Sequence, residues 1–293
     1  MAVALTGATG FVGRALAESL FHRGLKVLPI ARDVNPELIL PQANVVVHLA
    51  ARVHVMYEKS TNPLNDFRKS NVDATVSLAR QAAAAGIARF IFMSSVKVNG
   101  EESPLFLGFT ELDLPDPQDP YGVSKWEAEQ ALQQVAAETG MEVVIIRPPL
   151  VYGPGVKANF AALMRAVIRG WPLPFGAIQN ARSLVGLDNL VDFISCCMTH
   201  PAAANQTFLV SDGHDVSSAQ LVRELAAAAG VKPNLWSVPQ WFLEFGAVMV
   251  GRRKAVQRLC GSLQVDISKA RRVLGWQPAV SMQEGLKQAF LKV

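Results

Sequence analysis

The fold is decided by the stretch Thr6-Gly7-Ala8-Thr9-Gly10-Phe11-Val12-Gly13 near the start of the chain. An apolar run, Ala2–Thr6, precedes it and has the composition of a short buried strand. A helical pattern over Phe11–Arg23 follows, and Gly24 is suited to end that helix. The glycines allow a tight turn between strand and helix. Free N–H groups at the helix start attract an anion, so the stretch predicts a phosphate-binding turn.

Beyond this turn, apolar runs alternate with helical patterns. The predicted strands are Lys26–Ala31, Val45–Ala50, Arg89–Met93 and Glu142–Arg147, with helices over Asn71–Ala85 and Tyr121–Thr139 between the later ones. Continuous apolar strands that alternate with helices are typical of a parallel sheet covered on both faces. The expected fold class is therefore α/β, a doubly wound parallel sheet (Rossmann-like) with right-handed crossovers.

The character of the sequence changes after the last of these strands. Prolines and glycines cluster in two stretches, 148–155 and 170–176, and shorter elements follow. We expect an NAD(P)-binding domain over residues 1–150 and a smaller α+β substrate-binding lobe over residues 151–293. A segment of the second part, about 182–200, is expected to return to the first domain.

The interval between the second and third strands is unusually short. Only residues 34–44, eleven in number, separate Asp33 from Val45. A strand with its crossover helix normally needs more than that. Either the chain lacks a strand–helix unit that this fold usually has, or the printed sequence omits residues, and the sequence alone leaves both interpretations open.

Composition excludes several classes of protein. Half of the 293 residues are hydrophobic and 18% are charged, which is not the composition of a disordered chain. The net charge of +4 suits anionic ligands or an ordinary basic surface, and no Lys/Arg cluster predicts nucleic-acid binding. The most apolar later stretch, Trp241–Val250, is too short to insert across a membrane and is typical of a packed amphipathic helix.

The cysteines and the N-terminus indicate where the protein works. Cys196, Cys197 and Cys260 have no metal-ligand spacing and indicate free thiols in a reducing compartment. The first residues lack the basic region and the long apolar run of a signal peptide. We therefore expect a cytoplasmic protein without a metal site.

The glycine turn indicates a particular cofactor, because its position after a strand and before a helix favours a dinucleotide. Its spacing is Gly-x-x-Gly-x-x-Gly rather than the more common Gly-x-Gly-x-x-Gly. At the end of the second strand, Arg32 and Asp33 stand where an acid often recognises the ribose. Arg32 would suit the 2′-phosphate of NADP(H), whereas Asp33 keeps NAD(H) open. The predicted cofactor is NADP or NAD, and Arg32 favours NADP.

A second pattern predicts hydride-transfer chemistry. Tyr121 and Lys125 open a helix four residues apart, so they share one helical face. Ser94 and Ser95 follow a buried strand, at the sheet edge where ligands bind. A neighbouring ammonium and an oxidised nicotinamide favour the phenolate. Tyr121 can then exchange a proton with a hydroxyl or a ketone as hydride moves. Ser95 would orient the reacting oxygen, and Lys125 would also hold the nicotinamide ribose.

These motifs resemble the extended short-chain dehydrogenase/reductase family, especially its nucleotide-sugar epimerases and reductases. The resemblance covers nearly the whole chain. Besides the glycine turn and Tyr121-x-x-x-Lys125, it rests on His48-Leu49-Ala50-Ala51, Asn71 with Thr75, Ser94-Ser95-Val96-Lys97-Val98-Asn99-Gly100 and Arg147-Pro148-Pro149-Leu150-Val151-Tyr152-Gly153-Pro154. The family's sugar 4,6-dehydratases have an Asp-Glu pair after the catalytic Ser/Thr, where this chain has Val96-Lys97, which argues against dehydratase activity.

The resemblance implies roles for particular residues. The catalytic residues would be Ser95, Tyr121 and Lys125. The cofactor-binding residues would be Gly7, Thr9, Gly10, Phe11, Val12, Arg32, Leu49, Ala50, Ala51, Asn71, Tyr121, Lys125 and Pro148. The substrate-binding residues would be Ser95, Lys97, Asn159, Arg182 and Arg258. For Lys97, a simple solvent-exposed charge is an equally good interpretation. The resemblance also implies a homodimer through a four-helix interface, built from the helices after Asn71 and Tyr121.

Two enzymatic interpretations stay open. A UDP-sugar 4-epimerase would keep NAD tightly bound, remove hydride from C4 and return it to the other face. A 4-ketoreductase would use NADPH once per turnover. The second lobe is most similar to enzymes that make surface-polysaccharide precursors by reducing a UDP-4-keto-6-deoxy-HexNAc, and Arg32 favours this interpretation. A non-catalytic NAD(P)-binding sensor or scaffold is the remote alternative, and the presence of both Tyr121 and Lys125 argues against it.

Overall fold

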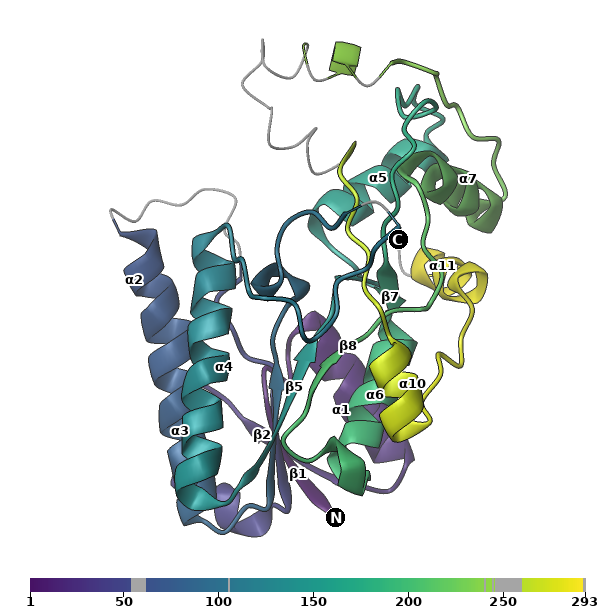
Figure 1. The fold of residues 1–293 in the computed structure, drawn as a ribbon. Helices are drawn as coiled ribbons and strands as arrows, with labels where there is room; N and C mark the ends of the chain where they lie inside the picture. The colour runs from purple at the N-terminus through teal and green to yellow at the C-terminus, as the bar shows by residue number, and fades with distance from the viewer. Residues whose placement is uncertain (54–61, 105, 240, 244, 246–259, 292–293) are drawn as a thin grey trace.

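A six-stranded parallel sheet forms the middle layer of the protein (Figure 1). The structure is a computed structural model that describes residues 1–53, 62–104, 106–239, 241–243, 245 and 260–291. The strands lie in the order β2-β1-β3-β4-β5-β8, and every neighbouring pair is parallel. Their bounds are Ala2–Thr6 (β1), Lys26–Ile30 (β2), Val45–His48 (β3), Arg89–Met93 (β4), Glu142–Arg147 (β5) and Thr207–Leu209 (β8). The predicted α/β fold class is confirmed.

Helices cover both faces of this sheet (Figure 1). On one face, α1 (Phe11–His22) packs beside α6 (Leu187–Thr199), and α10 (Ser268–Leu274) lies next to β8. The other face carries α2 (Pro63–Arg68), α3 (Ala74–Ala84) and α4 (Pro120–Thr139). Successive residues of a strand point to opposite faces. Val3 and Leu5 accordingly join the apolar core under α1, and Ala4 joins the one under α3.

Two short 3₁₀ turns bridge the interval that the sequence analysis found too short. They are η1 (Pro36–Leu38) and η2 (Leu40–Gln42), and Leu40 is fully buried in the core under α3. The chain then enters β3, which pairs directly with β1 on the side opposite β2. Residues 34–44 hold no further strand, so β2 forms one edge of the sheet.

The helix predicted from Asn71 begins earlier than the sequence suggested. Asn62 caps α2 by accepting the N–H of Asn65, and Pro63 occupies the first helical position. A π-helical segment, η3 (Lys69–Asp73), then joins α2 to α3. The extra residue in a π turn shifts the apolar periodicity, so the two halves do not form one continuous helical pattern. This shift explains why sequence periodicity recovered only the second half.

The second part of the chain forms a small lobe beyond the carboxyl ends of the strands (Figure 1). In it, β6 (Leu150–Tyr152) pairs in parallel with β7 (Leu184–Gly186). Among the described residues of the lobe, three helices pack into its core: α5 (Ala158–Ile168), α7 (Ser218–Ala229) and α11 (Met282–Phe290). The helix α6 lies against α1 instead, and the division of domains at residue 150 stays a prediction.

Two predictions fall wholly or largely on residues that the structure does not describe. Arg258 lies outside the described residues, and so does most of the helix predicted over Trp241–Val250. Within the described part of the chain, no helix has both the length and the apolar character needed to cross a bilayer.

Candidate active site

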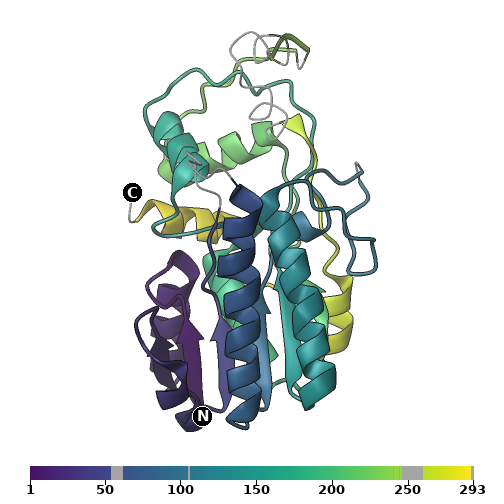
Figure 2. The same ribbon diagram turned by 90° about the vertical axis from the view of Figure 1, so that its left-hand side faces the viewer.

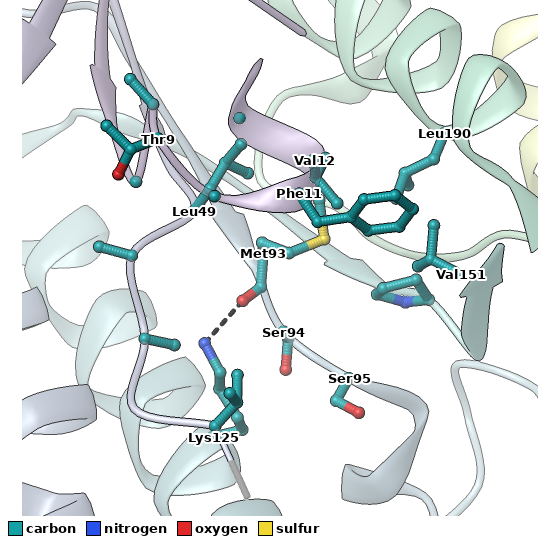
Figure 3. A pocket seen from close by; sticks show the side chains of 18 of the residues that line it. Thr9, Phe11, Val12, Leu49, Met93, Ser94, Ser95, Lys125, Val151 and Leu190 are labelled. Carbon is teal, nitrogen blue, oxygen red and sulfur yellow. Dashed lines mark hydrogen bonds between the residues drawn. The ribbon is translucent and has the colours of Figure 1, made fainter. Parts of the chain in front are cut away.

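A cavity of about 720 Å³ lies at the carboxyl ends of β1, β2, β3 and β4, where the lobe meets the sheet (Figure 3). All of the residues predicted to contact the cofactor line this cavity, with the exception of Asn71. Ser95 lines it as well. Parallel sheets bind ligands outside the carboxyl ends of their strands, so the position of the cavity is that of a ligand site.

The glycine turn has the close contacts that a dinucleotide cradle requires. Gly10 caps α1, and its N–H donates to the carbonyl of Gly7 at 2.9 Å. A Cβ on Gly7, whose φ is +68°, would lie 2.9 Å from the backbone nitrogen of Ala50. One on Gly13 would lie 2.0 Å from the Gly7 carbonyl oxygen. Only glycine fits at these two positions, and the free N–H groups of the helix start face the cavity that a pyrophosphate would enter.

Behind the cradle, a buried hydrogen-bond chain fixes the loop that follows β3. The Thr6 hydroxyl accepts the N–H groups of Leu49 and Ala50 at 3.2 and 3.1 Å, so its own proton goes to Nδ1 of His48 at 2.8 Å. Nε2–H of His48 then donates to Thr75 at 3.0 Å. Burial, assisted by the charge of Lys125, lowers the pKa of His48 to about 3. The imidazole therefore stays neutral and serves as a fixed spacer.

Asn71 supports the same loop from the other side. Its Oδ1 accepts the N–H of Arg52 at 2.8 Å, and its Nδ2 donates to the Arg52 carbonyl at 3.0 Å. Nδ2 also donates to the hydroxyl of Ser124 at 3.0 Å. The side chain is 1% exposed and lies behind the cavity wall. The structure thus places Asn71 as a link between the loop and α4, where the sequence analysis expected a direct cofactor contact.

The three residues predicted to be catalytic come together at one side of the cavity. Tyr121 lies in the first turn of α4, and Lys125 follows one turn later. Ser95 caps η4 (Val96–Val98), and its hydroxyl hydrogen-bonds the Tyr121 phenol. The ammonium of Lys125 lies 5.9 Å from the Tyr121 ring centre and donates to the Met93 carbonyl at 2.8 Å (Figure 3). A reacting atom of a bound ligand could therefore contact both the Tyr121 phenol and the Ser95 hydroxyl.

Burial shifts both titratable groups of this trio. It raises the pKa of Tyr121 well above its usual range, and the charge of Asp119 adds to this effect while the hydrogen bond from Ser95 opposes it. Burial lowers the pKa of Lys125 to about 7, opposed by the charge of Glu129. Without ligands, the phenol is therefore protonated at neutral pH, and the lysine is close to its titration point. Such shifts are typical of groups that exchange protons.

Replacing Lys125 with methionine is expected to abolish turnover and to stabilise the fold by about 1–3 kcal/mol at pH 7. In the unfolded chain this lysine has the ordinary pKa of 10.5, against about 7 in the folded chain. Between these values the unfolded chain binds more protons, so wild-type stability rises with pH. The advantage of the variant should therefore be largest at and below pH 7 and shrink towards pH 10.

Urea unfolding at several pH values measures this difference. A matched control is Lys69→Met, because Lys69 is exposed in η3. A stability difference between Lys125→Met and wild type that does not vary with pH would contradict the assigned burial cost.

A buried ion pair supports the trio from behind. Arg147 of β5 makes three hydrogen bonds to the carboxylate of Glu129, one from Nη2 at 2.5 Å and two from Nε at 3.0 and 3.2 Å. Ser94 donates to the same carboxylate, and Nη1 of Arg147 donates to Oδ1 of Asn99 at 3.0 Å. Glu129 is fully buried and Arg147 is 4% exposed. Glu129 is not among the predicted site residues, although its spacing of four residues from Lys125 places it on the same helical face.

The residues proposed for the substrate are more scattered. Lys97 is paired with Asp119, and Asn159 is exposed on α5. Nη1 of Arg182 donates to the carbonyl of Gly261 at 3.0 Å, and burial lowers the pKa of this guanidinium. None of these three lines the cavity. Lys97 lies beside the trio, because its partner Asp119 acts on Tyr121, whereas Asn159 and Arg182 are not brought to the trio.

Fold and cavity together are those of a Rossmann-like NAD(P)-binding protein, with a glycine cradle and a Ser-Tyr-Lys trio beside it. The model of the NAD dependent epimerase/dehydratase family matches residues 3–211. The chain is also 49% identical to the UDP-glucose 4-epimerase of Vibrio cholerae, over 99% of this chain and 95% of that protein. The chain therefore belongs to the NAD dependent epimerase/dehydratase family, and the resemblance seen in the sequence is confirmed.

Solved structures show the same fold. The UDP-glucose 4-epimerase of Thermotoga maritima with UDP-glucose superimposes with a TM-score of 0.77 at 24% identity, over 99% of this chain and 97% of that one. RMD from Pseudomonas aeruginosa complexed with NADPH gives 0.80 at 22% identity, over 100% and 99% of the two chains. The RMD structure holds NADPH and the family to which the chain belongs is NAD dependent, so the predicted NAD(P) cofactor is confirmed.

Proposed function

We propose that this protein moves a hydride at C4 of a nucleotide-activated sugar, with Ser95, Tyr121 and Lys125 as its catalytic residues. The observation that carries the proposal is the meeting of these three side chains at the wall of the cavity that holds the glycine cradle. Membership of the family and the similarity to an epimerase of UDP-glucose support a nucleotide sugar as the substrate.

The cofactor would lie along the cavity. The cradle at Gly7 and Gly10 would hold its pyrophosphate, and Lys125 would hold the ribose next to the nicotinamide. Arg32, exposed at the end of β2 and on the cavity wall, is placed to meet a 2′-phosphate, which supports NADP(H). When bound, the nicotinamide supplies or accepts the hydride.

The protein's own groups would handle the proton. Tyr121 donates a proton to the C4 oxygen when a ketone is reduced, or accepts one when an alcohol is oxidised. Ser95 hydrogen-bonds the same oxygen and orients it, and the ammonium of Lys125 stabilises the phenolate that results. These roles need no residue from the outer part of the lobe.

The first candidate activity is reduction of a UDP-4-keto-6-deoxy-HexNAc during synthesis of a surface-polysaccharide precursor. The raised pKa of Tyr121 supports it, because a protonated phenol can serve at once as the acid for a 4-keto oxygen. The second candidate is a UDP-sugar 4-epimerase that keeps NAD bound, which the Vibrio cholerae relative supports. Both candidates use the trio in the same way.

Further parts of the proposal concern binding and assembly. Asn159, Arg182 and Arg258 are proposed to contact the sugar or its diphosphate, whereas Lys97, which pairs with Asp119, is proposed below to act on Tyr121 instead. A homodimer is proposed through α3 and α4, which lie side by side on one face of the sheet (Figure 2). A cytoplasmic location is proposed because Cys196 and Cys197 are free thiols.

Absorbance at 340 nm tests the activity directly. The purified protein is expected to consume NADPH when a UDP-4-keto-6-deoxy-HexNAc is added, at least about tenfold faster than NADH because of Arg32. Proton NMR of UDP-glucose and UDP-N-acetylglucosamine incubated with the protein and NAD tests the epimerase. Interconversion of C4 epimers without net cofactor use would select the second candidate, and failure of both assays would overturn chemistry at C4.

A further inference from the structure

Lys97 carries a charge close to the catalytic trio, yet it does not line the cavity. Its ammonium pairs with the carboxylate of Asp119 and lies 3.9 Å from a carboxylate oxygen of Glu101. The side chains of Lys97 and Asp119 are 27% and 16% exposed, so the pair is largely shielded from water. A shielded pair is weakened little by dissolved ions and acts strongly on neighbouring groups.

The partner of this lysine begins the helix that carries the catalytic tyrosine. Asp119 caps α4 by accepting the N–H of Gly122 at 2.7 Å, and Tyr121 lies between these two residues. The turn η4 packs directly on this helix start. A Cβ on Gly122 would lie 2.9 Å from the carbonyl oxygen of Lys97. Lys97 therefore contacts the start of α4 through both its backbone and its side chain.

The charges around the phenol come from several elements. It has Asp119 at the N-cap of α4 and Lys125 one turn into that helix. On the η4 side it has Ser95, with Lys97 paired to Asp119 and Glu101 beyond that lysine.

The helix α2 adds an aromatic ring, and a more distant pair of charges joins α2 to the loop after β3. The Phe67 ring lies 6.2 Å from the Tyr121 ring, and Arg52 lies over it at 5.4 Å with Asp66 beside that arginine at 3.7 Å. Among all these groups, Asp119 is the one that raises the pKa of Tyr121 by its charge, and Lys97 is the cation bound to it.

We propose that Lys97 is a positioning residue for proton exchange at Tyr121, which acts by pairing with Asp119 and so holds the start of α4 and neutralises the carboxylate beside the phenol. The inference rests on the proposed function, which it deepens. Without Lys97, the charge of Asp119 would be unopposed by this ammonium, and the phenolate would be less stable. Oxidation of an alcohol, which needs the phenolate, should then suffer more than reduction of a ketone.

Four variants test this role by their pH profiles in both directions of the reaction. Lys97→Met removes the ammonium, whereas Lys97→Arg keeps a cation. Asp119→Asn removes the carboxylate charge and keeps the cap, because asparagine caps helices as well as aspartate does. The double variant Lys97→Met with Asp119→Asn removes both charges. Lys26→Met, at an exposed position at the start of β2, is the control for loss of a positive charge.

In the oxidation direction, Lys97→Met is expected to move the acid limb of kcat upwards by about one pH unit. Below that limb kcat falls about tenfold, while KM changes less than about threefold. Asp119→Asn should move the limb downwards. The double variant should return to within about threefold of wild type, and Lys97→Arg and Lys26→Met should match wild type.

Three results would overturn the inference. The kcat of Lys97→Met could match that of wild type at every pH. Alternatively, the fall in kcat caused by Lys97→Met could persist in the double variant. The effect of Lys97→Met could also lie in KM alone, which would assign Lys97 to the substrate instead.

A spectroscopic measurement separates this inference from the proposed function. The chain has three tyrosines, so ¹³C labelling of their ring carbons gives few signals, and Tyr121→Phe identifies that of Tyr121. The titration is followed with NAD⁺ or NADP⁺ bound and no sugar present. The pH midpoint at which the Tyr121 phenol loses its proton should rise in the order Asp119→Asn, wild type, Lys97→Met. Equal midpoints, or no titration below pH 10.5 in any of the three, would overturn the role of Lys97 whatever the substrate is.

Discussion

Tyr121→Phe is expected to reduce turnover by roughly 10³-fold and to leave NAD(P)H affinity within about threefold of wild type. The substitution removes only the phenolic oxygen, which is the proton donor and acceptor of the proposed reaction. The ring keeps its edge contact with Phe67 at 6.2 Å. Lys125 keeps its hydrogen bond to the Met93 carbonyl at 2.8 Å. Stopped-flow absorbance at 340 nm measures turnover, and fluorescence titration with NADPH measures affinity.

A second buried tyrosine provides a matched control for this experiment. The Tyr152 hydroxyl donates to Asp212 at 2.6 Å in the core of the lobe, outside the cavity. Asp212 would still accept the N–H of Gly186 at 2.8 Å and Nδ2 of Asn189 at 2.7 Å after the change. Tyr152→Phe should therefore lose about 1 kcal/mol of stability and little turnover. If Tyr121→Phe kept more than a tenth of wild-type turnover, the proton role of Tyr121 would be wrong.

The sequence predicted the parts of the site that short-range chemistry determines. The glycine turn is visible in a short stretch of sequence, because a backbone that passes close to other backbone atoms needs glycine. The same turn leaves the N–H groups at the start of α1 free. Tyr121 and Lys125 are brought together by the pitch of one helix. Such features are visible in a single window of sequence, and their positions in the structure agree with expectation.

The parts that the sequence did not predict depend on contacts between distant segments. The end of β3 at His48, before the predicted Ala50, follows from the Thr6 hydroxyl, which is 42 residues away and captures the next backbone N–H groups. Asn71 was assigned to the cofactor from its family motif, whereas its partners Arg52 and Ser124 come from two other elements. Position on a helix face does not reveal which neighbour a buried amide will meet.

The same limit applies to the lobe. Arg182 is an exposed-looking charge in the sequence, but an isolated antiparallel bridge joins it to Val216 and a parallel one joins it to Leu263. These contacts join segments between about 30 and 80 residues apart. The guanidinium is consequently held on the Gly261 carbonyl. The backbone bridges of Arg182 therefore explain why its side chain does not line the cavity.

Glu129→Ala is expected to lower the free energy of unfolding by about 3–5 kcal/mol. The change leaves the Arg147 guanidinium, 4% exposed, without the carboxylate that binds it at 2.5 Å. It also leaves the Ser94 hydroxyl without its acceptor. A loss of this size corresponds to a drop in Tm on the order of 10 °C for a domain of this length. Thermal unfolding followed by circular dichroism measures it.

The chain supplies a close control two residues away on the same helix. Glu127 also binds an arginine, Arg68 at 2.5 Å, but these side chains are 28% and 46% exposed. Glu127→Ala should therefore keep a Tm close to that of wild type, since water can solvate the arginine that remains. Replacing Glu129 and Arg147 together with methionine should recover most of the loss, because no buried charge is then unpaired. Equal Tm losses for Glu127→Ala and Glu129→Ala would show that the cost does not come from an unpaired buried charge.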